Sequence, residues 1–323
     1  MITLEVLLLL LIIAAAFLAV FSKEELSSII SLSIFSVSLT TIYLLYKAPD
    51  VAMAELVIGA GINTAIFMTT ISKVRTEKRE RIFRKKMKRK NLLVLLTLAL
   101  LSGVLLLNFN YIPDQQIVPG QLADHIIKAG VTETGSLNLV TAILYDYRAF
   151  DSLGESTVVF AAVSAIVLIL SFKTLPVSSH GLSFIVKRTF SFLTPFIFLF
   201  GLYIITHGHI SPGGGFQGGV ILASISIIFS IVYGSSFDYQ KYSPKFKTIL
   251  ETAGALIFVS VGGIGIITQG FFLANLSPLY GQTGSLISAG SIPLINLGVG
   301  FKIGAGMAII FYSMIQKAYR EEL

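Results

Sequence analysis

Nine long apolar runs constrain this chain more than any other feature of its sequence. A helix needs about 20 apolar residues to cross the hydrocarbon core of a bilayer, where each backbone N–H and C=O must find a partner within the protein. Hydrophobic residues make up 54% of the chain and charged residues 13%, which is not the composition of a soluble domain. We therefore predict an all-α, polytopic integral membrane protein. Its expected spans are 2–21, 26–46, 51–72, 92–107, 156–172, 191–206, 220–233, 252–271 and 293–316.

The first run has a competing interpretation as a signal peptide. It lacks a basic segment before the apolar residues, and its nearest basic residue, Lys23, follows the run instead. We therefore interpret residues 2–21 as a retained span.

The basic residues are concentrated between two of these runs. Eleven of the 24 Lys and Arg residues lie in residues 73–90. In a soluble protein this stretch would favour nucleic-acid binding, but between two spans it is typical of a cytoplasmic loop near anionic lipid headgroups. From this anchor we expect the N-terminus outside and the C-terminus in the cytoplasm of a cell-membrane protein without a nucleic-acid partner. Lys241, Lys245 and Lys247 then belong to another cytoplasmic loop.

The absence of cysteine excludes several chemistries from this chain. Disulfides, iron–sulfur clusters, thiolate zinc sites and cysteine nucleophiles all require the thiol. Any iron–sulfur chemistry must therefore belong to a partner chain. We expect no cofactor, no bound metal and no enzymatic activity of this chain by itself.

The glycine-rich segment, residues 207–219, separates two apolar runs and reads His-Gly-His-Ile-Ser-Pro-Gly-Gly-Gly-Phe-Gln-Gly-Gly. Glycine disfavours a helix and Pro212 lacks an N–H, so we expect the backbone to open here and to find its partners in protein, in a wet cavity or at the interface. His207 and His209 titrate near neutral pH and are candidate proton carriers at the mouth of a path. A turn that only lets neighbouring subunits pack closely remains an equal alternative.

Two spans carry polar residues that are costly inside a bilayer. Glu55 and Asn63 lie eight residues apart, about two turns along one helix face, and form a candidate ion track. Lys302 stands among Gly298, Gly300, Gly304 and Gly306, which permit close helix contact. We expect Lys302 to belong to a proton relay, or else to pair with a buried acid for structure alone.

A charged cluster precedes the fifth span. Asp146, Arg148, Asp151 and Glu155 fall within ten residues and are expected at the membrane edge. They are further candidates for an ion path, and the alternative is a set of surface ion pairs worth little stability.

Three of these stretches resemble signatures of one group of membrane complexes. The glycine-rich segment, through Ser211, Pro212, Gly213, Gly214, Gly215, Phe216 and Gln217, resembles the B-subunit family of Mrp-type multisubunit sodium/proton antiporters and its equivalents in membrane-bound hydrogenases and sulfane reductases. Residues 49–56 resemble the D-type component of those hydrogenases, and residues 146–155 resemble the E-type module. The surroundings of Lys302 also resemble the last helix of the B-subunit family.

The resemblance implies three modules in one chain: a D-type module of three helices over residues 1–90, an E-type module of two over 91–180 and a B-type module of four over 181–323. It implies a subunit that takes part in Na+/H+ translocation, either in a stand-alone antiporter or coupled to a hydrogenase or sulfane reductase. Its implied partners are other membrane subunits, including long antiporter-like ones, and a peripheral iron–sulfur module in a redox-driven complex.

Two other functions remain open at the level of sequence. The chain could be a structural scaffold that has no ion path of its own. It could also be a self-contained secondary transporter, although the expected inverted repeat is not visible in the arrangement of spans.

Overall fold

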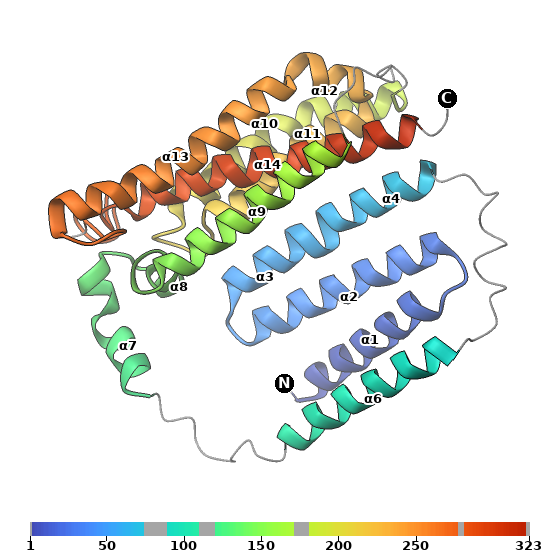
Figure 1. The fold of residues 1–323 in the computed structure, drawn as a ribbon, viewed down its shortest axis with the longest axis horizontal. Helices are drawn as coiled ribbons and strands as arrows, with labels where there is room; N and C mark the ends of the chain where they lie inside the picture. The colour runs from blue at the N-terminus through green and yellow to red at the C-terminus, as the bar shows by residue number, and fades with distance from the viewer. Residues whose placement is uncertain (1, 74–88, 110–119, 171–180, 277–280, 321–323) are drawn as a thin grey trace. The chain divides into compact units, whose positions relative to one another are not determined.

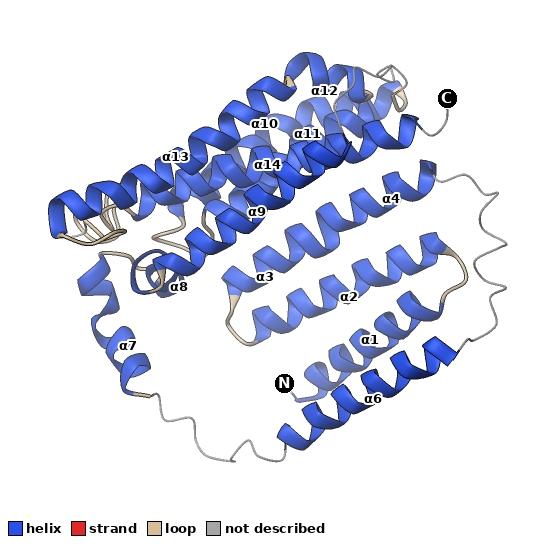
Figure 2. Ribbon diagram, in the orientation of Figure 1, coloured by secondary structure: helices blue, strands red, loops and turns tan. Residues whose placement is uncertain are grey.

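The computed structural model describes residues 2–73, 89–109, 120–170, 181–276 and 281–320. These residues are helices joined by turns and loops, and Figure 2 shows no strand among them. The chain forms two compact units, one of residues 1–73 with 126–323 and the other of residues 74–125. Within the second unit the main described element is α6, Arg89–Phe109.

The N-terminal part of the first unit is a row of three antiparallel helical rods (Figure 1). They are α1 (Ile2–Phe21), α2 (Glu25–Leu45) and a third rod made of α3 (Pro49–Glu55), the π-helix η1 (Leu56–Asn63) and α4 (Thr64–Lys73). In α2, the hydroxyl groups of Ser31, Ser38 and Thr40 donate hydrogen bonds to the backbone carbonyls four residues earlier. These hydroxyl groups are thereby satisfied within the helix.

The C-terminal part is a bundle built around α14 (Figure 1). Its helices are α9 (Ala149–Leu170), α10 (Phe184–His207), α11 (Gly215–Val232), α12 (Ser235–Lys241), α13 (Pro244–Gln269) and α14 (Ile292–Arg320). Phe258, Ile292, Ile295, Ile303 and Phe311 are almost fully buried in its core. Three shorter elements precede α9: α7 (Gln121–Thr134), α8 (Leu139–Ala142) and the π-helix η3 (Ile143–Tyr147).

Glycines bring the bundle helices into backbone contact. A Cβ on Gly219 of α11 would lie 2.7 Å from the carbonyl oxygen of Gly300, and one on Gly254 of α13 would lie 2.3 Å from that of Gly298. Such close approach leaves no room for a side chain at Gly219 or Gly254, and small residues serve this purpose at membrane helix interfaces generally. The expectation that the small residues around Lys302 permit tight packing is confirmed.

The expected spans agree with the helices. Eight helical segments among the described residues are long and apolar enough to cross a membrane, and the ninth expected span, 92–107, lies within α6. Most of the basic stretch 73–90 falls outside the described residues, as does His180.

The assignment of Lys241, Lys245 and Lys247 to a loop was wrong. Lys241 is the last residue of α12, and Lys245 and Lys247 belong to α13, which begins at Pro244, eight residues before the expected span at 252–271. The reason is local: Pro244 occupies the first helical turn, where its missing N–H costs nothing, and the Ser243 side chain accepts a hydrogen bond from the Phe246 N–H.

Candidate functional site

The glycine-rich segment opens the backbone as expected, but only in part. Helix α10 ends at His207 and α11 begins at Gly215, so residues 208–214 form the connection and residues 215–219 are helical. Gly213 and Gly214 have φ angles of +147° and +143°, a region that disfavours any side chain. The expected start of the next span at 220 was wrong by five residues, because α11 begins at Gly215, whose N–H is accepted by the Asn296 side chain at 2.9 Å.

A buried aspartate holds this connection from another part of the chain. The Asp50 Oδ1 atom accepts hydrogen bonds from the Gly213 N–H at 2.9 Å and from the Asn138 side-chain amide at 3.0 Å. Asp50 lies at the start of α3 and is 7% exposed. The carboxylate therefore joins the third helical rod to the glycine-rich segment.

Asn138 and Thr141 complete this network from α8. The Asn138 amide donates to the Gly208 and Ser211 carbonyls, both at 3.1 Å, while its oxygen caps α8 by accepting the Val140 N–H. The Thr141 hydroxyl donates to the same Gly208 carbonyl at 2.7 Å. The open backbone is thus satisfied within the protein, which confirms one of the expected environments.

The two histidines of the segment diverge. His207 stacks on Tyr203 with ring centroids 4.2 Å apart, and its Nδ1 lies 3.2 Å from the Tyr203 carbonyl. His209 is fully buried, its Nε2 lies 3.2 Å from the Ser285 carbonyl, and burial lowers its pKa. Within the described residues no three His, Asp or Glu side chains gather as a metal site would require.

A cavity of about 320 Å³ lies beside the network. Its acidic lining residues are Asp50 and Glu155, and Ser152, Ser156 and Gln217 add further polar groups. Val299 and Ile303 of α14 close its apolar side. The structure therefore places Glu155 with Asp50 and separates it from the rest of the charged cluster.

The other members of that cluster do not form one group. Arg148 and Asp151 make an ion pair at 2.5 Å with side chains that are 69% and 52% exposed, so the surface alternative describes this pair. Asp146 instead accepts a hydrogen bond from the Asn275 amide at 2.9 Å, and burial raises its pKa.

Glu55 and Asn63 line one groove of about 290 Å³ on the third rod, together with Ser36 and Gly59. The intervening residues form the π-helix η1, whose wider turns are frequent at functional sites. A Cβ on Gly59 would lie 2.4 Å from the Ser36 hydroxyl and 2.6 Å from a Glu55 carboxylate oxygen. The glycine is therefore what leaves room for the acid.

Lys302 is 2% exposed and has a buried acidic neighbour, Glu251 of α13, which is 4% exposed. The two residues flank the α13–α14 crossing, because a Cβ on Gly254 would lie 2.9 Å from the Lys302 Cβ and one on Gly306 would lie 3.8 Å from Glu251 Oε1. The Lys302 ammonium lies 4.6 Å from the centroid of the Phe160 ring of α9. The Glu251 Oε1 atom finds no hydrogen-bonding partner in the part of the chain that is described. The close crossing at Gly254 sets this geometry, because a bulkier residue would push the two helices apart.

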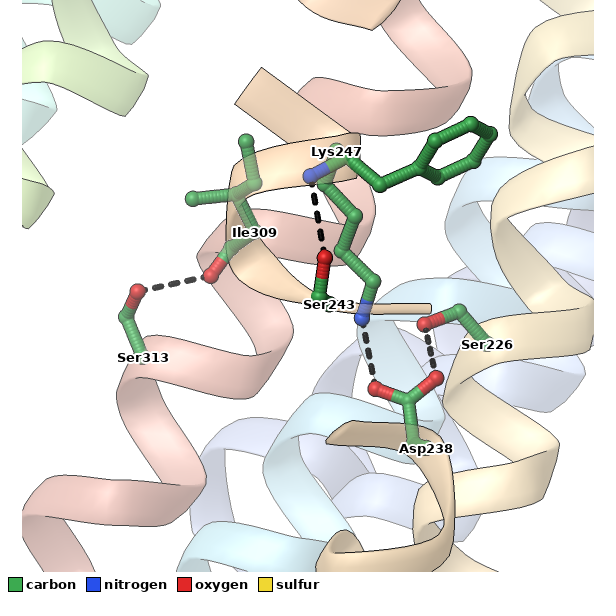
Figure 3. Close-up of polar contacts among 7 residues, drawn as sticks. Ser226, Asp238, Ser243, Lys247, Ile309 and Ser313 are labelled. Atoms are coloured by element: carbon green, nitrogen blue, oxygen red, sulfur yellow. Dashed lines mark hydrogen bonds and ion pairs between the residues drawn. The ribbon is translucent and has the colours of Figure 1, made fainter. Parts of the chain in front are cut away.

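A second buried pair joins Lys247 to Asp238, as Figure 3 shows. Lys247 stands one helical turn before Glu251 in α13. The Lys247 ammonium lies 2.5 Å from Asp238 Oδ2, and the Ser226 hydroxyl donates to Asp238 Oδ1 at 2.7 Å. Lys247 is 4% exposed and Asp238 fully buried. Together Asp238, Lys247, Glu251 and Lys302 form what we call the charge row.

Sequence reasoning missed five of these residues. Asp50 stood in the stretch that resembles the D-type component, and Asn138 preceded the E-type stretch, so both could have been selected as side-chain partners for an opened backbone. Asp238 and Lys247 gave no signal, because their polar surroundings are typical of a loop, and Glu251 stood just before the expected span 252–271.

Fold and site together define the class: a polytopic membrane protein whose helices carry buried charges of both signs and an interlocked glycine-rich connection. Three family models match the chain: MbhD, the D-type component of MBH, over residues 10–76; MbhE, the E-type component of MBH, over 87–180; and a domain related to the MnhB subunit of Na+/H+ antiporter over 185–309. The chain belongs to this family of MnhB-, MbhD- and MbhE-type membrane proteins.

Relatives agree with this assignment. The chain is 33% identical over 195 residues to the uncharacterized protein MJ1307 of Methanocaldococcus jannaschii, covering 53% of this chain and 74% of that protein. It is 28% identical over 165 residues to the A-type component of the Na(+)/H(+) antiporter of Bacillus subtilis, covering 50% of this chain but only 20% of that protein. The chain thus spans a small part of the antiporter protein it matches.

Two solved complexes contain similar chains. A chain of the Mrp complex from Dietzia sp. DQ12-45-1b superposes with a TM-score of 0.74 at 20% identity, covering 95% of this chain and 34% of that one, which shows the shared fold. A chain of the membrane-bound sulfane sulfur reductase, an archaeal respiratory membrane complex, gives a TM-score of 0.61 at 29% identity, covering 71% of this chain and 99% of that one.

Proposed function

We propose that this chain is a non-catalytic membrane subunit of an Mrp-type Na+/H+ antiporter module and takes part in ion translocation across the cell membrane. The module works either as a stand-alone antiporter or coupled to a membrane-bound hydrogenase or sulfane reductase. The observation that carries the proposal is the Lys302–Glu251 pair, which is buried and lies within the MnhB-related segment. Opposite charges without a direct contact are costly in hydrocarbon and are typical of ion paths.

The partners follow from the same proposal. Other membrane subunits, including long antiporter-like ones, surround the chain, and a redox-driven complex adds a peripheral iron–sulfur module. The basic stretch 73–90 faces the cytoplasm, with the N-terminus outside and the C-terminus inside. The three modules 1–90, 91–180 and 181–323 correspond to subunits that are separate in other complexes. Glu55 and Asn63, with the acids of the cavity, are the remaining ion-path candidates.

A structural role is the alternative for the glycine-rich segment in particular. Its carbonyls and N–H groups are engaged by Asp50, Asn138 and Thr141, which favours a function in holding the helices together. This alternative concerns residues 207–219 and leaves the charge row unexplained.

The experiment starts with isolation of the tagged native chain in mild detergent and identification of the chains that accompany it. Long antiporter-like subunits are expected, and iron–sulfur chains decide between the redox-driven and the plain antiporter. Na+/H+ antiport is then measured in vesicles of cells with Lys302→Met or Glu55→Gln. Loss of antiport with the complex intact supports the proposal, whereas loss of assembly with each variant supports a scaffold.

A further inference from the structure

We propose that the charge row conducts protons and not sodium ions, and that Glu251 is the residue that exchanges a proton with Lys302. The inference rests on the proposed function and specifies which ion this part of the chain carries. It is drawn from four buried charges and their contacts.

The row alternates in sign along the packed helices. Asp238 on α12 contacts Lys247 on α13, and Glu251 follows one turn later, about 6 Å along the helix. Lys302 on α14 lies with Glu251 at the crossing of the two helices, beside Gly254 and Gly306. Lys302 lies ten residues from the start of α14, a rise of about 15 Å. The row therefore leads from the α12 end of the bundle to the middle of a membrane span.

The two halves of the row differ in how many of their polar atoms have hydrogen-bond or ion-pair partners. Asp238 is held on both oxygens, by Lys247 and by Ser226, and Lys247 also lies 5.1 Å from the centroid of the Tyr312 ring. Glu251 Oε1 has no partner within the described residues, and Lys302 faces the Phe160 ring. The first pair is locked, whereas the second has room for a proton or a bridging water.

The donor set of the row suits a proton. A sodium ion that sheds its water needs several oxygen ligands, as hard cations generally do. The row offers two ammonium groups and two aromatic faces beside its two carboxylates, and the ammonium groups repel a metal cation. Amines and carboxyls do exchange protons, and lysine shifts readily between its two forms when buried.

Each proton transfer along the row conserves both atoms and charge. Once Lys302 has released a proton to an acceptor beyond the row, Lys247 gives a proton to the Glu251 carboxylate, so that an N–H bond breaks and an O–H bond forms. The Glu251 carboxyl then passes this proton to the Lys302 amine, and Lys247 is reprotonated through Asp238 from the α12 end. The row returns to its starting charges, and one proton has passed.

The test compares two transport reactions of the whole complex in everted vesicles. Sodium uptake driven by an imposed pH difference needs both ions, whereas exchange of radioactive for unlabelled sodium at equal pH needs only the sodium path. For Glu251→Gln, and likewise Lys302→Met, we expect uptake at the level of vesicles without the complex and exchange as in the wild type.

Three results would overturn the inference. Retained pH-driven uptake in Glu251→Gln would show that the row is not the proton path, and joint loss of uptake and exchange in an assembled complex would show that sodium uses it. If the single variants do not assemble, the double variant Glu251→Gln/Lys302→Met removes both charges together, and uptake retained by it counts equally against the inference. A wild-type complex with neither reaction would instead refute the proposed function.

A matched serine pair on α11 supplies the control. Ser226→Ala removes the hydroxyl that holds Asp238, and we expect slower pH-driven uptake with normal exchange. Ser230, one turn later, has a buried hydroxyl without a partner in the described chain, so Ser230→Ala is expected to behave as the wild type in both reactions. Equal rates in the two variants would contradict the part assigned to Asp238.

Discussion

The carboxylate of Asp50 accepts the N–H of Gly213 at 2.9 Å, although 163 residues separate the two in the chain. The contact ties the first turn of α3 to the connection between α10 and α11, and the Asn138 amide shares the same carboxylate oxygen. One side chain thus secures a backbone conformation that glycine alone would leave loose.

Replacement of Asp50 by alanine is expected to lower the midpoint of thermal unfolding of the purified complex. The change leaves the buried Gly213 N–H without its acceptor, and an unsatisfied buried group costs about 1–3 kcal/mol. Asp151→Ala is the control, because its partner Arg148 is mostly exposed and such pairs contribute about 0–1 kcal/mol. Equal midpoints for both variants would contradict the structural role of Asp50.

Gly254→Ala is expected to destabilise the bundle and to reduce transport. Its Cβ would lie 2.3 Å from the Gly298 carbonyl oxygen, so α13 and α14 must separate where Glu251 faces Lys302. Gly263→Ala, on the same helix, meets nothing within 4 Å and is expected to leave both properties unchanged. Thermal unfolding and antiport are measured for both variants. Unchanged values in Gly254→Ala would argue against close packing of α13 and α14 at this position.

Gly59→Ala is expected to disturb the groove of Glu55 and Asn63. The added methyl would lie 2.4 Å from the Ser36 hydroxyl and 2.6 Å from Glu55 Oε1, so side chains or helices must move. Gly61→Ala, in the same π-helix, would only reach an ordinary contact of 3.7 Å with the Leu56 carbonyl. If Glu55 belongs to an ion path, antiport falls in the first variant and persists in the second.

The stability of the protein is expected to fall as the pH drops below about 6.5, the usual pKa of histidine. Burial lowers the pKa of His209, so the folded state binds this proton less readily than the unfolded state. The unfolded state therefore gains protons first, and stability is lost between about pH 6.5 and the lower folded pKa. His209→Asn should flatten this part of a curve of unfolding midpoint against pH, and an unchanged slope would exclude His209 as its source.

The membrane spans were predictable because an apolar run of about 20 residues forms a helix that crosses the bilayer. Lys302 was predictable as a buried lysine for the same reason. Its neighbour Glu251 was not, because the rotation of α13 against α14 depends on the backbone contact of Gly254 with Gly298, which sequence spacing does not report.

Lys247 shows a second limit. Taken alone, a lysine beside Lys241 and Lys245 indicates a loop in water, and only the partner Asp238, held in place by Ser226, makes its burial tolerable. The helical part of the glycine-rich segment shows a third limit of prediction from sequence. Glycines 215, 218 and 219 stay in α11 because they face other helices closely, where the absence of a side chain outweighs their low helix propensity.

The interlocking of α3, α8 and the glycine-rich segment has a consequence for assembly. Where the corresponding domains occur in different chains, their pairing depends on the abundance of each chain. Here one polypeptide carries Asp50, Asn138 and Gly213, so their meeting is a loop closure with a high effective concentration. Their stoichiometry is set at one to one by translation, and dilution cannot separate them.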